Sequence, residues 1–247
     1  MAQPLKILGI IGARSGSKGV PDKNIKPLEG VPLVGRIIEK AKQSKHINRV
    51  VVSTDSEEYA TVARTFGADT PFLRPAEFAT DKSPEVEYVK HALAWLEEHE
   101  GYVPDIAVRL MATVPLQSTE DIDACIDELL KDEEADSAVV IAEARQHPVK
   151  ALKIIPDGAG GEKLVTYFTE SGREVTPLAR QNYEKAYFRA NIIACRTPVI
   201  FNTDSMTGDT VRFHVIPQER AIDIDSETDF LILEALLKRR SAPKRDT

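Results

Sequence analysis

The sequence has few cysteines, no long apolar run and no excess of positive charge. Its two cysteines, Cys125 and Cys195, cannot make a disulfide framework or a metal-ligand set, and their apolar surroundings favour a structural role. The formal net charge of -7 makes nucleic acid and anionic membranes poor partners. The apolar start ends in Ala-Arg-Ser-Gly rather than at a signal-peptide cleavage site, and no run approaches the length of a membrane span. We therefore expect a cytoplasmic protein with no nucleic-acid or membrane partner.

Short apolar runs alternate with helical patterns through the first two thirds of the chain. Strands are expected to begin near Lys6, Arg49, Asp105 and Asp136, and helices near Leu33, Glu57, Pro84 and Ser118. Such alternation is typical of βαβ units. The 247 residues therefore predict one α/β domain with a Rossmann-like, doubly wound and mainly parallel sheet.

The alternation of short apolar runs with helical patterns ends after Ala144. Residues 145–195 mix polar and aromatic side chains, contain a glycine-rich turn near Gly160 and show no long helical pattern. We expect a small insertion lobe over about 145–195, made of short antiparallel strands packed over one edge of the sheet. Strand and helix patterns return at Val211 and Glu227.

The loop after the first strand, from Gly12 to Asn24, has the composition of a phosphate site. It carries three glycines, two serines and the cations Arg14, Lys18 and Lys23. Glycines let the backbone approach a ligand, and cations can hold a triphosphate and stabilise the pyrophosphate that leaves. The loop is neither a Walker A motif nor G-x-G-x-x-G, so a flexible, solvated turn is the alternative interpretation.

Two aspartates near the C-terminal end, Asp223 and Asp225, are candidate metal ligands. In an extended segment they would point to the same side, with Ile224 opposite. Neighbouring carboxylates repel unless a cation lies between them, and Mg²⁺ is the usual metal in nucleotidyl transfer. The alternative is that they cap the last helix, although Glu227 and Asp229 are better placed for that.

The run ARSGSKGVPDKNIKPLEGVPLV, from Ala13, resembles the signature A-R-x-G-S-K-G-x-x-x-K-N-I of the acylneuraminate cytidylyltransferases, the CMP-sialic acid synthetases. VVVSTD from Val50, FLRPAEFATD from Phe72 and AIDIDSETDF from Ala221 resemble later blocks of that family in order and spacing. The resemblance covers essentially the whole chain. It implies an enzyme that uses CTP and a nine-carbon acidic sugar, and that forms a homodimer through the insertion lobe.

The resemblance also implies roles for individual residues. The nucleotide-binding set is Ala13, Arg14, Ser15, Gly16, Ser17, Asn24 and Arg74. The sugar-binding set is Lys150, Arg180, Arg189 and Asn191. Arginine and lysine suit the carboxylate of an α-keto acid sugar, although each of these cations alone could be an ordinary solvated side chain. The resemblance further implies that Arg14, Lys18 and Lys23 act on the phosphates, and that Asp223 and Asp225 bind the catalytic Mg²⁺. Asp55 fits the cleft and the start of a helix equally well.

The chain departs from the family pattern at three places. Met111 stands where the family has a glutamine that helps to hold the sugar, and a thioether cannot replace its hydrogen bonds. Ser83-Pro84-Glu85 stands where serines are usual, and Asn191 begins the sequence NIIAC instead of the usual NGAIY. These changes leave the nucleotide and metal residues intact and concern the sugar.

The sequence therefore predicts a cytidylyltransferase that makes a CMP-activated sugar and releases pyrophosphate. It does not single out a general base or a particular acid sugar. One alternative is a guanylyl- or cytidylyltransferase that acts on a sugar 1-phosphate. Another is a nucleotide-binding relative without catalytic activity.

Overall fold

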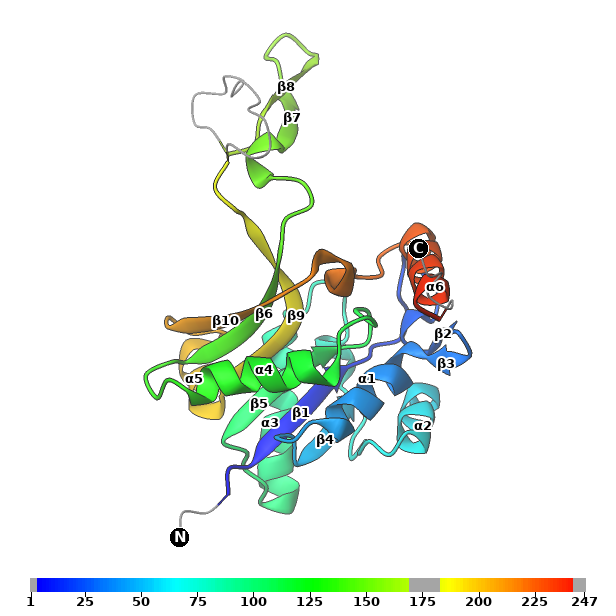
Figure 1. Ribbon diagram of the computed structural model, residues 1–247, viewed down its shortest axis with the longest axis vertical. Helices are drawn as coiled ribbons and strands as arrows, with labels where there is room; N and C mark the ends of the chain where they lie inside the picture. The colour runs from blue at the N-terminus through cyan, green and yellow to red at the C-terminus, as the bar shows by residue number, and fades with distance from the viewer. Residues whose placement is uncertain (1–3, 169–182, 242–247) are drawn as a thin grey trace, which may run out of the picture.

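The computed structural model describes residues 4–168 and 183–241, and its body is a six-stranded sheet (Figure 1). The strand order is β10 (Val211–Ile216), β6 (Ser137–Glu143), β9 (Tyr187–Arg196), β5 (Ile106–Met111), β1 (Ile7–Gly12) and β4 (Arg49–Ser53). β9 runs antiparallel to β5 and β6, while the other neighbours are parallel. The Rossmann-like, mainly parallel sheet predicted from the sequence is confirmed.

The central strands are apolar because both of their faces are covered. In β1 the alternation of side chains sends Ile7 and Ile11 into one hydrophobic cluster, and Leu8 and Ile10 into the other. The first cluster is completed by α1 (Leu33–Gln43), α4 (Thr119–Leu130) and α6 (Glu227–Ser241). The second is completed by α3 (Glu85–Glu100) and α5 (Thr197–Thr203). The sheet is therefore doubly wound, as expected.

The remaining elements are short and connect the main ones. They are η1 (Lys23–Ile25), β2 (Pro27–Leu28), β3 (Val31–Pro32), α2 (Glu57–Thr65), η2 (Ala76–Phe78), η3 (Pro148–Lys150) and η5 (Gln218–Ala221). A capping box begins α4: Asp121 N–H donates to Ser118 Oγ at 3.3 Å, and Ser118 N–H donates to Asp121 Oδ2 at 2.9 Å. None of the described helices is long and apolar enough to cross a membrane.

The insertion lobe projects from the body instead of lying over an edge of the sheet (Figure 1). It contains the antiparallel hairpin of β7 (Leu152–Pro156) and β8 (Glu162–Thr166), which confirms the expected short strands. The expected end of the lobe near residue 195 is wrong, because Tyr187–Arg196 forms β9 in the middle of the main sheet. Residues 190 and 192–195 of this strand are buried on both faces, as a central strand requires.

Candidate active site

The carboxyl ends of β1, β4 and β5 meet at one edge of the sheet, where α/β proteins bind ligands. A pocket of about 250 Å³ lies at this edge, between the loop after β1 and the start of α3. The residues around it are Gly12, Arg14, Ser17, Lys23, Asn24, Arg74, Phe78, Thr80, Asp81, Ser83, Glu85, Tyr88 and Met111–Thr113. We call this cavity the nucleotide pocket, because five of the residues predicted to hold nucleotide or phosphate lie on it.

Two cations of the loop after β1 share one carboxylate. Arg14 Nη2 lies 2.7 Å from Asp81 Oδ1, and Lys18 Nζ lies 2.5 Å from Asp81 Oδ2. The hydrogen bonds from Lys18 and then Arg14 hold the pKa of Asp81 below its usual range. Lys18 is 83% exposed, so a triphosphate that reached the loop could draw this side chain away from Asp81 at little cost. Asn24 Nδ2 donates to the Arg14 carbonyl at 2.9 Å, and this hydrogen bond joins the two ends of the loop.

Some of the loop residues that were predicted to bind the nucleotide already form hydrogen bonds within the protein. The Ala13 N–H donates to the Ser53 carbonyl at 3.0 Å. The Ser15 N–H and Oγ donate to Asp55 at 2.7 and 2.9 Å. These two residues therefore shape the loop, whereas Ser17 lies on the pocket and Gly16 makes the turn with φ of 69°. Ser56 caps α2, whereas Asp55 holds Ser15 and does not line the nucleotide pocket.

Arg74 forms the base of the pocket rather than a mobile surface cation. It is only 5% exposed; Nε donates to Ser53 Oγ at 3.0 Å, and the guanidinium lies 4.4 Å from the centre of the Tyr88 ring. Burial is the main reason why its pKa is lowered. Tyr88 also packs on Gly12, where an added Cβ would come within 2.7 Å of the ring. The small residue that ends β1 thus lets the aromatic ring reach the pocket.

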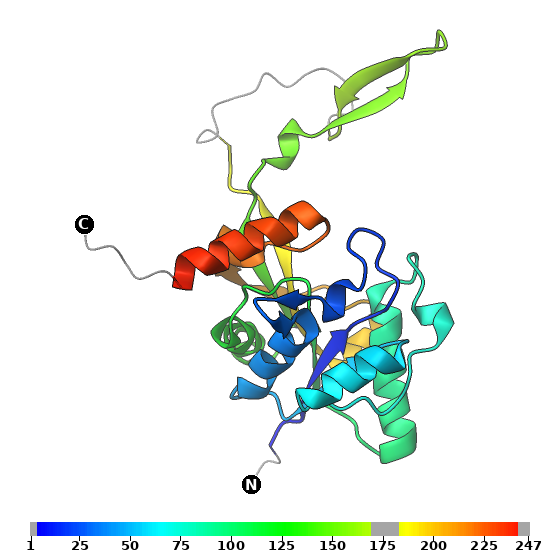
Figure 2. The ribbon, with the colours of Figure 1, turned by 90° about the vertical axis from the view of Figure 1, so that its right-hand side faces the viewer.

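The cationic loop meets the acidic segment near the C-terminal end. Lys23 Nζ lies 3.5 Å from Asp225 Oδ1 and donates a hydrogen bond to the Ile224 carbonyl. A Cβ added at Gly19 would lie 2.1 Å from the Asp225 carbonyl oxygen, so the two backbones touch here. In Figure 2 the loop after β1 lies beside the start of α6. Groups 201 residues apart in the sequence therefore border one site.

The two aspartates have different environments. Asp225 is 84% exposed, whereas Asp223 is largely buried, and burial followed by the nearby Asp225 charge raises the pKa of Asp223. Asp223 Oδ2 accepts a hydrogen bond from Asn191 Nδ2 at 2.7 Å. Asp223 Oδ1 is buried and has no hydrogen-bond partner among the described residues. Asn191 reaches Asp223 from the irregular part of β9, where its φ of 64° is left-handed.

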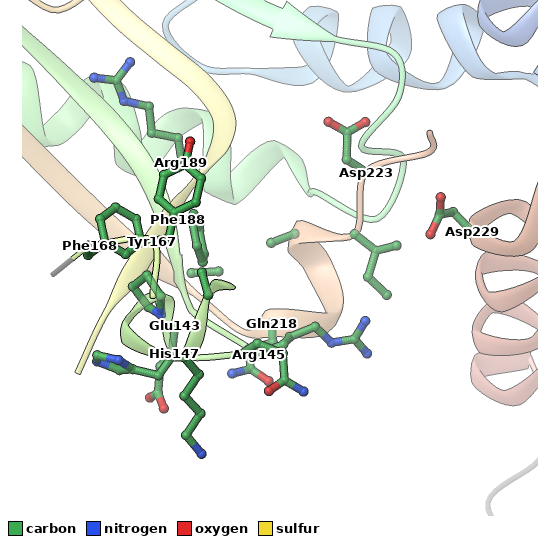
Figure 3. A pocket seen from close by; sticks show the side chains of 17 residues that line it. Glu143, Arg145, His147, Tyr167, Phe168, Phe188, Arg189, Gln218, Asp223 and Asp229 are labelled. Carbon is green, nitrogen blue, oxygen red and sulfur yellow. The ribbon is translucent and has the colours of Figure 1, made fainter. Parts of the chain in front are cut away.

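A larger cavity of about 800 Å³ lies at the base of the lobe, and we call it the lobe pocket. Lys150, Arg189 and Asp223 all lie on it. Figure 3 shows Asp223 at one end of this pocket and the aromatic side chains at the other. The aromatic side chains are Tyr167, Phe168 and Phe188. Thr113 of the nucleotide pocket adjoins Asp223 of the lobe pocket, so the walls of the two pockets are in contact there.

The structure brings together most of the residues predicted from the sequence, but not all. Arg189 lies on the lobe pocket with its guanidinium pointing away from Asp223 (Figure 3). Lys150 lies 5.7 Å from the Tyr183 ring. Arg180 lies outside the described residues. Asn191 was expected beside the sugar, and its side-chain amide contacts Asp223.

Several residues on the pockets were not found from the sequence. They are Asp81, Glu85, Tyr88 and Thr113 on the nucleotide pocket, and Arg145 and Gln218 on the lobe pocket. The pairing of Asp81 with Arg14 joins residues 67 positions apart, a separation that no local spacing encodes. The end of β5 and the start of α3 could have marked Thr113 and Glu85, because strand ends and helix starts border such clefts.

The doubly wound sheet, the cationic loop after β1 and the aspartates that meet it define a nucleotidyltransferase. The chain belongs to the cytidylyltransferase family, whose model matches residues 8–217. The resemblance to the acylneuraminate cytidylyltransferases is thereby confirmed.

Several relatives match along nearly the whole chain. The CMP-N,N'-diacetyllegionaminic acid synthase of Campylobacter jejuni is 31% identical over 98% of this chain and 99% of its own length. The post-translational flagellin modification protein B of Campylobacter coli is 32% identical, with the same coverage. The N-acylneuraminate cytidylyltransferase of Escherichia coli is 29% identical, and this chain spans 54% of its length.

Solved structures support the fold. The CMP:2-keto-3-deoxy-manno-octonic acid synthetase complexed with CTP superposes with a TM-score of 0.67, over 95% of this chain and 99% of that one. Its sequence identity of 16% makes this a likeness of fold alone.

Proposed function

We propose that the protein transfers CMP from CTP to a nine-carbon α-keto acid sugar of the sialic-acid type and releases pyrophosphate. The observation that carries this proposal is the contact of Lys23 with Ile224 and Asp225, which unites the cationic loop and the acidic segment at one edge of the sheet. The family membership and the relatives that act on sialic and legionaminic acids support the same reaction.

The nucleotide would lie with its phosphates toward the loop after β1. Arg14, Lys18 and Lys23 carry the positive charge there, and the Arg14–Lys18–Asp81 cluster can open to receive phosphate oxygens. The nucleoside would lie toward Arg74 and the start of α3, where Asn24 also borders the pocket. This orientation keeps the phosphates near the acidic segment through Lys23.

Asp223 and Asp225 fit the Mg²⁺ that this chemistry uses. Oxygen ligands are the ones that Mg²⁺ prefers, and the buried, unpartnered Asp223 Oδ1 is an acceptor that a cation would satisfy. The described residues contain no cluster of three or more His, Cys, Asp or Glu ligands, so phosphate oxygens and water would complete the shell. When bound, the metal would neutralise phosphate charge and lower the pKa of an attacking hydroxyl.

The acid sugar would occupy the lobe pocket, which is large enough for it and whose Asp223 adjoins Thr113 of the nucleotide pocket. Lys150 and the newly found Arg145 could meet the sugar carboxylate, and Arg189 could do so only after its guanidinium turns toward Asp223. The anomeric hydroxyl would attack the α-phosphorus of CTP in line, so that its oxygen–phosphorus bond forms while the bond to the β-phosphate oxygen breaks. Pyrophosphate leaves toward Arg14 and Lys18, and the side chains do not single out the base that accepts the hydroxyl proton.

A matrix of nucleotides and acceptors tests the reaction. CTP, UTP, GTP and ATP are each incubated with sialic, legionaminic and pseudaminic acids and with sugar 1-phosphates, and pyrophosphate is measured. We expect release with CTP and an acid sugar. Release only with a sugar 1-phosphate would establish the first alternative, and nucleotide binding without turnover across the matrix would establish the inactive relative.

The metal assignment is tested by Asp225→Ala. Because Asp225 is 84% exposed, we expect the variant to keep its melting temperature and to lose turnover by at least about 100-fold. Glu227→Ala, which removes a neighbouring carboxylate that pairs with Lys26 at 2.8 Å, is the matched control and should keep its activity. Equal activity of the two variants across a Mg²⁺ titration would remove the metal role from Asp225.

We also propose that the protein forms a homodimer through the lobe and works in the cytoplasm, where CTP is made. The lobe hairpin supports the dimer, because Ile154 and Leu164 are cross-strand partners and are 65% and 62% exposed. Such an apolar surface is typical of a protein–protein contact.

A further inference from the structure

The largest fully buried side chain of the described residues is an arginine in the middle of the sheet. Arg109 lies in β5 and is 2% exposed. Its Nη1 lies 2.9 Å from both carboxylate oxygens of Glu85 and 2.9 Å from Met111 Sδ. Its Nε is buried without a hydrogen-bond partner. Burying a guanidinium in the core of a sheet lowers the stability of the fold, so we expect Arg109 to have a role beyond packing.

Arg109 connects the start of α3 to the end of β5. The structure joins Glu85 and Met111 to the same guanidinium nitrogen. Both residues line the nucleotide pocket, whereas Arg109 lies behind them. Tyr88, a third pocket residue, is close enough for Arg109 to oppose the rise in pKa that burial causes. Arg109 therefore acts on the pocket through its neighbours.

The result is a carboxylate held in a fixed place on the pocket wall. Glu85 is 50% exposed, so one side of it is open to a ligand while Arg109 holds the other. A carboxylate accepts hydrogen bonds and donates none. It repels phosphate and carbonyl oxygens, and the cations proposed to hold the phosphates belong to the loop after β1, whereas Glu85 begins α3. The ligand group that faces Glu85 must therefore be a hydrogen-bond donor at the nucleoside end.

We propose that Glu85, positioned by Arg109, accepts a hydrogen bond from the exocyclic amino group of cytosine and so sets the choice of CTP over UTP. Uracil has a carbonyl oxygen at that place, which Glu85 would repel. This inference rests on the proposed function for the identity of the nucleotide. Glu85 is then the specificity-determining residue, and Arg109 is a positioning residue.

The test compares nucleotide selection in Glu85→Gln, Arg109→Met and wild type. Binding of CTP and UTP is measured by calorimetry, and kcat/KM is measured for both with an accepted acid sugar. We expect wild type to prefer CTP by at least about tenfold in binding. Glu85→Gln should bring the ratio close to one, because an amide can donate to the uracil oxygen as well as accept from the cytosine amine. Arg109→Met should lower the ratio less and change KM more than kcat.

Glu87→Gln is the matched control, because Glu87 is also in the first turn of α3 but lies outside the nucleotide pocket. It should keep the wild-type ratio. An unchanged CTP-to-UTP ratio in Glu85→Gln would overturn the proposal. So would a changed preference between CTP and 2'-deoxy-CTP with the base preference intact, since Glu85 would then face the ribose. If no acid sugar is turned over, the proposed function fails, but the binding ratio still tests Glu85.

Discussion

Lys23 touches both halves of the candidate site. Its ammonium group is held by the Ile224 carbonyl and Asp225, and its side chain is only 16% exposed. A charge held in place before the reaction stabilises developing charge on phosphate without reorganisation. Lys23 is therefore expected to contribute more to the transition state than the exposed Lys18 does.

The corresponding prediction concerns Lys23→Ala. We expect kcat/KM to fall by about 100- to 1000-fold, or about 2.7–4 kcal/mol, in a pyrophosphate-release assay. Lys26→Ala removes a nearby cation that pairs with Glu227. In this control, kcat/KM should fall by less than about threefold. A loss of tenfold or less in Lys23→Ala would make it an ordinary structural lysine.

Asp223, which we propose binds Mg²⁺, is expected to weaken the fold when no metal is bound. Its pKa is raised above the ordinary 3.8, chiefly by burial. An acid with a raised pKa in the folded state supports the fold below its ordinary pKa, and that support is lost as pH rises through the raised value. The metal-free protein therefore carries an unfavourable buried charge at neutral pH.

Asp223→Asn should consequently raise the melting temperature of the metal-free protein at neutral pH. The advantage should shrink as pH falls through the raised pKa, because the native side chain is then also neutral. In wild type, the rise in melting temperature caused by Mg²⁺ should grow as pH rises through the same pKa, because binding needs the ionised form. A destabilised Asp223→Asn at neutral pH would contradict this account.

The sequence revealed the residues that occur in local patterns. The cations of the loop after β1 and the Asp223–Asp225 pair stand in short, distinctive runs, and the structure places them around one edge of the sheet. Arg109 could not be foreseen, because a lone arginine in an apolar strand has no local signal and its partner Glu85 lies 24 positions earlier. Asp81 could not be foreseen either, because its partner Arg14 lies 67 positions earlier in the sequence.

Among the elements, the loop after β1 depends on a close backbone contact. Gly19 lies against the Asp225 carbonyl oxygen, where a Cβ would have only 2.1 Å. Gly19→Ala must push the loop and the acidic segment apart. We expect activity to fall by at least about tenfold, with a loss of about 1–3 kcal/mol in stability by chemical denaturation.

Gly16→Ala provides the comparison within the same loop. A Cβ at Gly16 meets nothing within 4 Å, but its φ of 69° strains the backbone. It should lose stability by about 1 kcal/mol while keeping more activity than Gly19→Ala. Equal losses of activity in both variants would mean that loop conformation matters and the contact with Asp225 does not.

The helices and parallel strands followed from hydrophobic periodicity, while the end of the lobe did not. β9 returns the chain from the lobe and enters the sheet antiparallel between β5 and β6. Its first three residues, Tyr187, Phe188 and Arg189, are exposed, and only its later half is uniformly apolar. A strand that begins in one part of the molecule and ends in another has no single period for sequence reasoning to detect.

At the scale of the whole molecule, the lobe predicts the state of assembly. The double variant Ile154→Lys and Leu164→Glu replaces an exposed apolar pair by charges, leaving the hairpin with a cross-strand ion pair. We expect wild type to sediment as a dimer and this variant as a monomer. Lys153→Glu with Lys163→Glu, on the same hairpin, is the control and should remain dimeric. A monomeric wild type at micromolar concentration would refute the dimer.

The contact of Lys23 with Ile224 has a consequence for synthesis of the chain. The ribosome makes the cationic loop 201 residues before the acidic segment that it contacts. The strands from β1 to β10 can assemble while translation continues, but the catalytic surface closes only when the final helix has emerged. A nascent or C-terminally truncated chain should therefore hold a folded sheet and no catalytic power, so that no activated sugar is made by unfinished protein.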